Sequence, residues 1–239
     1  MGPSSLLLPN EPERLLALAP YRVLGTAPDA VFDEVVRLAA KLFEVPVALI
    51  SLVDEHSVWF KANLGLAGTT QVARDESFCS VAILQEETTV FQDLQAEPCE
   101  LLKPGVPETL QLRFYAGHPL HDAQGYAIGS VCVMDHQPRP FAAGEQQRLQ
   151  QLASIVARML RLRLAIAGQV ELARTTWVQL YDQLDASLTR LDTLAELARW
   201  EEASDTPSAV AYHRSREEEK QLVLRRLSQQ VDVALAAAS

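Results

Sequence analysis

The stretch LRFYAGHPLHDAQGYAIGSVCVMD, residues 112–135, decides the fold of this chain. Two runs rich in aromatic and β-branched residues flank the polar stretch 121–125, which ends in glycine. This pattern is typical of a β-hairpin with a tight turn. The second run, 126–133, holds Gly129 among β-branched residues, which indicates an inner strand approached closely by another backbone. The segment 137–140, with two prolines, ends that strand.

Upstream of the hairpin, three more segments have the composition of strands. Residues 47–53 form a continuous apolar run, which predicts a buried strand, and residues 58–63 predict a second strand that Gly65 ends. Residues 88–91 predict a third, and 92–111 read as a long loop with a helical turn. Between the second and third of these strands, Asp75 or Ser77 is expected to cap a short helix that carries Cys79 in its first turn.

Helical periodicity appears at both ends of the chain. Residues 11–18 predict a helix stopped by Pro20, and residues 31–43 predict an amphipathic helix capped by Thr26 or Asp29 and ended by Pro46. After the hairpin, residues 141–166 resume the helical pattern, which Gly168 is expected to interrupt.

The last seventy residues predict two further helices. The first carries a seam with the spacing of a coiled coil or helical bundle, and the second runs from about 209 to 235 after a break at 201–208. Helices joined this closely usually lie antiparallel, so we expect a helical hairpin whose apolar seam is buried by a second copy of the chain. The seam residues are Trp177, Tyr181, Leu184, Leu188, Leu191, Ala195 and Ala198, and the apolar side of the last helix is Leu222, Val223, Leu227, Val231 and Leu235.

These elements predict an α+β chain with an antiparallel sheet flanked by helices, followed by an α-helical hairpin or coiled-coil extension. We place the first domain at residues 1–165 and the extension at 166–239. The net charge of −10 and the lack of a lysine and arginine cluster argue against nucleic acid as a partner. No apolar run is long enough to span a membrane, and three cysteines without metal-type spacing fit a reducing compartment, so we expect a cytoplasmic protein.

Several strings resemble the GAF family of sensory domains. The hairpin carries Arg-Phe-Tyr-Ala-Gly-x-Pro-Leu at 113–120, then Gly129, Cys132 and Asp135. Pro46 to Asp54, Trp59 to Ala62 and the Arg-Asp-x-Ser-Phe-Cys string at 74–79 are also similar to this family, although Val81 stands where relatives often have histidine. The resemblance covers about residues 11–160 and implies a GAF/PAS-like fold.

The resemblance also implies a cytoplasmic, non-catalytic signal-transduction module. It would bind an unidentified small molecule or sense redox state, and relay this through the C-terminal helices, as a homodimer, to a downstream signalling protein. The cofactor is unknown. Polar groups over an apolar floor are suited to a small anionic ligand. The expected ligand-binding residues are Trp59, Phe60, Lys61, Arg74, Phe78, Cys79, Arg113 and Tyr115.

Alternatives remain open for several of these residues. Arg113 could instead form a structural ion pair with Asp135, and Cys79 could be a small buried hydrophobic residue. Some GAF proteins are free methionine sulfoxide reductases, and Cys79 with Cys99 would be the thiols of such an enzyme. A third class is a structural scaffold whose interior is filled by side chains. We predict no metal site, because His118, His121 and His136 near the hairpin ends need not converge. Some GAF proteins attach a bilin through a cysteine followed by histidine, and since Ser80 follows Cys79 we also predict no covalently attached bilin.

Overall fold

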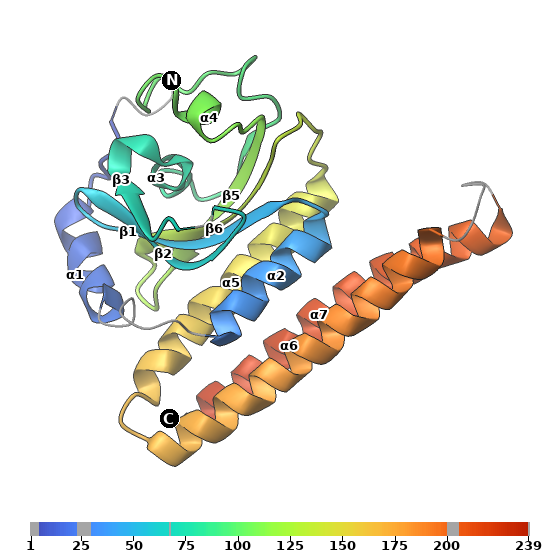
Figure 1. Ribbon diagram of the computed structural model, residues 1–239. Helices are drawn as coiled ribbons and strands as arrows, with labels where there is room; N and C mark the ends of the chain where they lie inside the picture. Colours follow the sequence, from blue (N-terminus) through green and yellow to red (C-terminus); the bar gives the residue numbers. More distant parts are fainter. Residues whose placement is uncertain (1–4, 23–29, 67, 200–205, 239) are drawn as a thin grey trace.

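In the computed structural model, which describes residues 5–22, 30–66, 68–199 and 206–238, the hairpin lies inside an antiparallel sheet (Figure 1). The strand order is β3-β2-β1-β6-β5-β4, so the second strand of the hairpin pairs with β1 on one side and β5 on the other. The hairpin prediction is confirmed. The strands are β1 Val47–Val53, β2 Ser57–Leu64, β3 Gln71–Ala73, β4 Thr89–Phe91, β5 Phe114–His121 and β6 Ala127–Asp135.

Gly129 of β6 lies opposite Leu52 of β1, where the two backbones approach closely. A Cβ atom at this position would stand 1.9 Å from the carbonyl oxygen of Ser51, far inside van der Waals contact. Only glycine therefore lets these two central strands pair at this point, as the sequence indicated.

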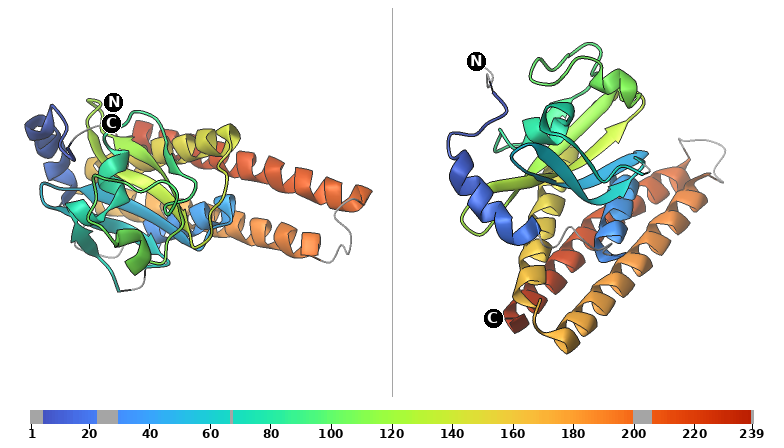
Figure 2. Two further views of the ribbon diagram at one scale, coloured as in Figure 1. Left: turned by 90° about the horizontal axis from the view of Figure 1, so that it is seen from above. Right: turned by 60° about the vertical axis from the view of Figure 1, so that its left-hand side comes forward.

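Helices cover one face of the sheet in two layers (Figures 1 and 2). The inner layer is α2 Ala30–Phe43 and α5 Ala143–Ala165, which contact the strands. Behind them lies the hairpin of α6 Val170–Arg199 and α7 Pro207–Ala238, with α6 against α2 and α7 against α5. The opposite face of the sheet carries the short helices α3 Phe78–Ala82 and α4 Val106–Thr109 and the connecting loops.

The apolar seam of the C-terminal hairpin is buried within the chain itself. Leu180, Leu184, Leu188 and Leu191 of α6 belong to the same apolar cluster as the buried residues of α2 and α5. The prediction that a second copy buries this seam is therefore wrong, because α2 and α7 of the same chain cover it. Two details of the predicted seam also differ: Tyr181 is 37% exposed, and on α7 Leu224 is buried while Leu222 is only half-buried.

An N-terminal helix, α1 Glu11–Arg22, is held against the sheet by buried charges. Arg14 is fully buried and donates to the carbonyl oxygens of Val53 at 2.6 Å and Ala127 at 3.4 Å. Its Nη2 also pairs with Glu11 at 2.6 Å. The helix continues through Pro20, contrary to the predicted stop, because proline has a φ angle that a helix accepts at the cost of one hydrogen bond.

Other boundaries were close to the prediction. The predicted caps of the second helix, Thr26 and Asp29, and most of the predicted break at 201–208 lie outside the described residues. The second helix ends at Phe43, followed by Glu44 at a φ of 56°, rather than at Pro46. The three-residue β3 was missed because it is too short to show periodicity. Among the described helices, none combines the length and apolar composition needed to cross a membrane.

Candidate sensory site

Five polar side chains gather in the apolar interior between the sheet and α3. Ser51 lies on β1, Tyr115 on β5, Ser130 and Cys132 on β6, and Cys79 in the first turn of α3. Each of the five is at most 2% exposed. We call this set the thiol–hydroxyl cluster. It lies on the face of the sheet opposite α2 and α5, so α3 is the element that closes it from above.

The contacts within the cluster join α3 to the two central strands. The Sγ atoms of Cys79 and Cys132 are 3.6 Å apart, within the range of a thiol hydrogen bond. The hydroxyls of Ser51 and Ser130 are 3.0 Å apart, as their direct pairing in the sheet register requires. Ser77 caps α3, with its Oγ accepting from the Cys79 backbone N–H at 3.2 Å, so the predicted cap is confirmed for Ser77.

The surroundings of the two thiols give them different acidities. Hydrogen bonding from Cys132 lowers the pKa of Cys79, and the nearby serine hydroxyls add to this effect. Burial raises the pKa of Cys132 well above its ordinary value, and the neighbouring Cys79 raises it further. Of the two thiols, Cys79 is therefore the more acidic.

Two hydroxyls at the site are left without a good hydrogen bond among the described residues. The Tyr115 hydroxyl lies close to the Cys79, Cys132 and Ser130 side chains, but no contact has hydrogen-bond geometry. The Ser80 hydroxyl of α3 is likewise buried without a partner. A buried, unsatisfied hydroxyl is energetically unfavourable, so such groups call for a functional or solvent-mediated explanation.

Aromatic rings fill the space around the cluster. The rings of Phe78 and Tyr115 lie 5.2 Å apart, and Phe91 of β4 lies 5.5 Å from Phe78. Phe91 and Val81 also line a surface groove of about 520 Å³ beside α3. A ligand that enters the cluster from this groove must displace the rings. Side chains thus fill the interior, as the scaffold alternative requires, but the thiols and hydroxyls at its centre are polar.

Only part of the predicted ligand-binding set meets at this site. Phe78, Cys79 and Tyr115 lie together, and Phe60 packs against the same apolar cluster. Trp59 is 43% exposed on β2. Lys61 is buried against α2, with its Nζ 5.2 Å from the centre of the Phe32 ring, so it lies on the opposite face of the sheet from Cys79.

The two predicted arginines are held by structural partners. Arg74 is 5% exposed and donates to both carboxylate oxygens of Glu11, at 2.5 and 3.3 Å, and to the Leu6 carbonyl at 2.6 Å. Arg113 forms a two-point ion pair with Asp93, at 3.0 and 2.8 Å. The alternative for Arg113 was right in kind and wrong in partner, because its side chain pairs with Asp93 rather than Asp135.

Cys99 lies in the loop after β4 and lines the groove beside α3. The thiol in contact with Cys79 is that of Cys132, not the one expected for a methionine sulfoxide reductase. The pairing of Cys79 with Cys99 in such an enzyme stays a prediction.

Ser51, Ser130 and Cys132 were missed as members of a site. The first two were readable in principle, because each is a polar residue inside an apolar strand run, VALISLV and AIGSVCVM. Their direct pairing, however, depends on the register between strands that are 79 residues apart.

Known proteins support the fold seen here. A model of the GAF domain family matches residues 27–160, more than half of the chain. The chain is 38% identical over 143 residues to a cyclic di-GMP phosphodiesterase of Pseudomonas aeruginosa, a match that covers 59% of this chain and 24% of that protein. The chain thus spans about a quarter of the length of this curated relative.

Solved structures of low identity align as well. The GAF domain of a phosphoenolpyruvate-protein phosphotransferase from Coxiella burnetii is 18% identical, with a TM-score of 0.49 over 65% of this chain and 96% of that one. The corresponding Acinetobacter domain is also 18% identical, with a TM-score of 0.48 over 65% and 98% of the two chains. The family match, together with the six-stranded sheet and its two helical layers, shows that the chain belongs to the GAF domain family.

Proposed function

We propose that this chain is a non-catalytic sensory module that detects a small molecule or a redox change at the thiol–hydroxyl cluster. The observation that carries the proposal is the unsatisfied Tyr115 hydroxyl beside two thiols in an apolar interior. An inert scaffold gains nothing from such groups, because burying a polar group without a hydrogen bond is unfavourable. A small ligand with hydrogen-bonding atoms would satisfy them.

The output of the module is the α6–α7 hairpin. A chain of polar contacts leads to it from the end of β6, the strand that holds Ser130 and Cys132. Arg139, which follows β6, donates to the carbonyl oxygen of Phe43 at 2.8 Å. The next residue, Glu44, accepts from Arg216 at 2.9 Å and from Lys220 at 3.0 Å, both on α7. A shift of β6 that accompanies ligand binding would therefore alter how α7 is held.

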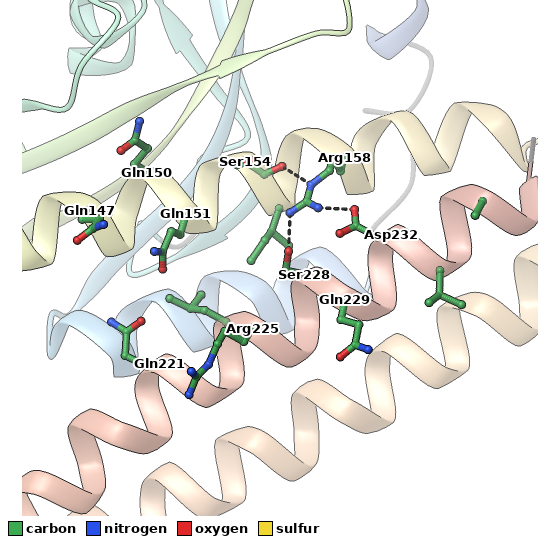
Figure 3. A pocket seen from close by; sticks show the side chains of 14 residues that line it. Gln147, Gln150, Gln151, Ser154, Arg158, Gln221, Arg225, Ser228, Gln229 and Asp232 are labelled. Carbon is green, nitrogen blue, oxygen red and sulfur yellow. Dashed lines mark hydrogen bonds and ion pairs between the residues drawn. The ribbon is translucent and has the colours of Figure 1, made fainter.

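A homodimer and a downstream signalling protein are the partners that complete this proposal. Since the seam is buried within the chain, another surface must serve for dimer formation. A groove of about 940 Å³ lies between α5 and α7. Figure 3 shows the side chains of both helices that line it. Arg158 bridges it by an ion pair with Asp232 and a 2.9 Å hydrogen bond to Ser228. The groove combines apolar side chains with amides, hydroxyls and charged groups, a mixture that fits contact with a protein partner.

Native mass spectrometry of the purified chain tests the proposal, because it reports both subunit number and retained small molecules. Tyr115→Phe removes only the unsatisfied hydroxyl, and Tyr126→Phe, half-exposed at the hairpin turn, is the matched control. In a sensor, Tyr115→Phe reduces ligand retention while Tyr126→Phe does not. In a scaffold, no ligand is retained by any variant and Tyr115→Phe only stabilises the fold, by about 1 kcal/mol. Hydrogen exchange of α7 with and without ligand then tests the output.

A further inference from the structure

We propose that Cys79 and Cys132 are a redox switch, which a hydroperoxide converts into a disulfide that ties α3 to the central strand of the sheet. The inference deepens the proposed function and rests on it, since it names the redox partner of Cys79 and the effect of oxidation on the site. The geometry that carries it is the direct contact of the two sulfur atoms across the layer between α3 and β6.

The sulfur atoms need only a short movement to bond. They lie 3.6 Å apart, whereas a disulfide bond is about 2.05 Å long, so the gap to close is about 1.5 Å. Cys79 sits on a helix of five residues that is linked on both sides by short connections, and such an element can shift by this amount more readily than the central strand can. Closing the bond therefore draws the first turn of α3 down onto β6.

The chemistry is balanced by the two thiols and the peroxide. The Cys79 thiolate attacks the terminal oxygen of the hydroperoxide, the O–O bond breaks, and the alcohol or water leaves with a proton, which gives a sulfenic acid on Cys79. The Cys132 sulfur then attacks the Cys79 sulfur, and hydroxide leaves and takes the Cys132 proton as water. Two electrons pass from the thiols to the peroxide, and one S–S bond forms.

The pKa shifts of the two thiols support attack on the peroxide by Cys79 first and by Cys132 on Cys79 second. The pKa of Cys79 is lowered by its hydrogen bonds, whereas burial keeps the Cys132 thiol protonated. Access is the slow step, because both sulfurs are buried. Val81 and Phe91 line the groove beside α3, and the Phe91 ring contacts the Phe78 ring, which precedes Cys79 in the chain, so a peroxide from this groove must pass these rings.

Oxidation has a defined consequence for the site. With the disulfide in place, α3 can no longer lift from β6, so the thiol–hydroxyl cluster is closed to ligands. A covalent link between residues 53 apart also restricts the unfolded chain. The melting temperature of the oxidised protein is thus expected to exceed that of the reduced protein by at least about 5 °C.

The test treats the full-length protein with hydrogen peroxide and maps its disulfides by mass spectrometry under non-reducing conditions. The expected result is a linked peptide pair containing Cys79 and Cys132, the loss of two thiols and two hydrogen atoms per chain, and reversal by dithiothreitol. Cys99→Ser, the matched control, must behave like the wild type. Cys132→Ser must instead accumulate oxygen on Cys79, because the resolving thiol is gone.

A disulfide between Cys79 and Cys99, a disulfide between chains, or oxidation confined to Cys99 would overturn the proposal. The mapping on the wild type does not depend on whether the variants fold. It also does not depend on a ligand: a Cys79–Cys132 bond without any retained ligand would refute small-molecule sensing but leave the switch intact. A retained ligand without the Cys79–Cys132 bond after peroxide treatment would refute the switch but leave small-molecule sensing intact.

Discussion

Neutralising Glu11 should destabilise the fold out of proportion to the size of the change. The Glu11 carboxylate is 12% exposed and is shared by Arg14 and Arg74, whose side chains are 0% and 6% exposed. Glu11→Gln keeps the shape but removes the carboxylate charge that both arginines share. Removing one partner of a buried ion pair typically costs about 3–5 kcal/mol, because the remaining charge stays buried.

The acidity of Glu11 gives a second route to the magnitude. Burial alone would raise its pKa, but hydrogen bonds from Arg14 and Arg74 outweigh burial and lower the pKa from 4.5 to about 2. One pKa unit corresponds to about 1.4 kcal/mol, so this interaction is worth about 3 kcal/mol. Because the pKa is lowered in the folded state, this contribution is complete above about pH 5 and is lost as the pH falls toward 2.

The assay is urea unfolding at pH 7 and at intervals down to pH 2. Glu11→Gln should lower the free energy of unfolding by about 3 kcal/mol at pH 7, against a total of about 5–15 kcal/mol for a domain. Glu13→Gln, the same change on an exposed side chain of the same helix, should lie within about 0.5 kcal/mol of the wild type. The difference between wild type and Glu11→Gln should shrink as the pH falls from 4.5 to 2. A loss below about 1 kcal/mol, an equal loss in both variants, or a difference that does not change with pH would refute the reasoning.

Three further changes test other parts of the structure. Gly129→Ala should cost at least about 3 kcal/mol of unfolding free energy, since its Cβ would meet the Ser51 carbonyl oxygen at 1.9 Å. Gly144→Ala, with open space around it, should be neutral or slightly stabilising. Similar losses in both variants would contradict the close approach. Leu184→Ala should lower the free energy of unfolding by about 2–5 kcal/mol at any protein concentration, since the seam is buried within one chain. A loss that depends on protein concentration would instead indicate that a second copy covers the seam. Free methionine sulfoxide should not be reduced at a thiol-dependent rate by the wild type, with Cys79→Ser as the comparison, and such turnover would overturn the non-catalytic proposal.

Local sequence patterns predicted most elements but few of their partners. The hairpin 112–135 is readable because β-branched runs and a glycine-ended turn are properties of neighbouring residues. The amphipathic helices are readable for the same reason, since periodicity records which side of a helix is buried. Periodicity does not say what buries it, which is why the seam of α6 was assigned to a second copy although α2 and α7 cover it.

The candidate site shows the same division. Cys79 could be singled out from its position in the first turn of a predicted helix, and Phe78 and Tyr115 from the family resemblance. Lys61, which neighbours Phe60 in the sequence, points to the opposite side of the sheet because side chains alternate along a strand.

Sequence alone thus determined most of the strands and helices and the resemblance to the family, because local composition and periodicity record which residues favour each element and which side of it is buried. Only the tertiary structure decided that Cys79 meets Cys132, that Ser51 faces Ser130, and that Glu11 joins Arg74 across 63 residues. Such contacts depend on strand register and on the packing of α3 and α1 over the sheet, which no local pattern encodes.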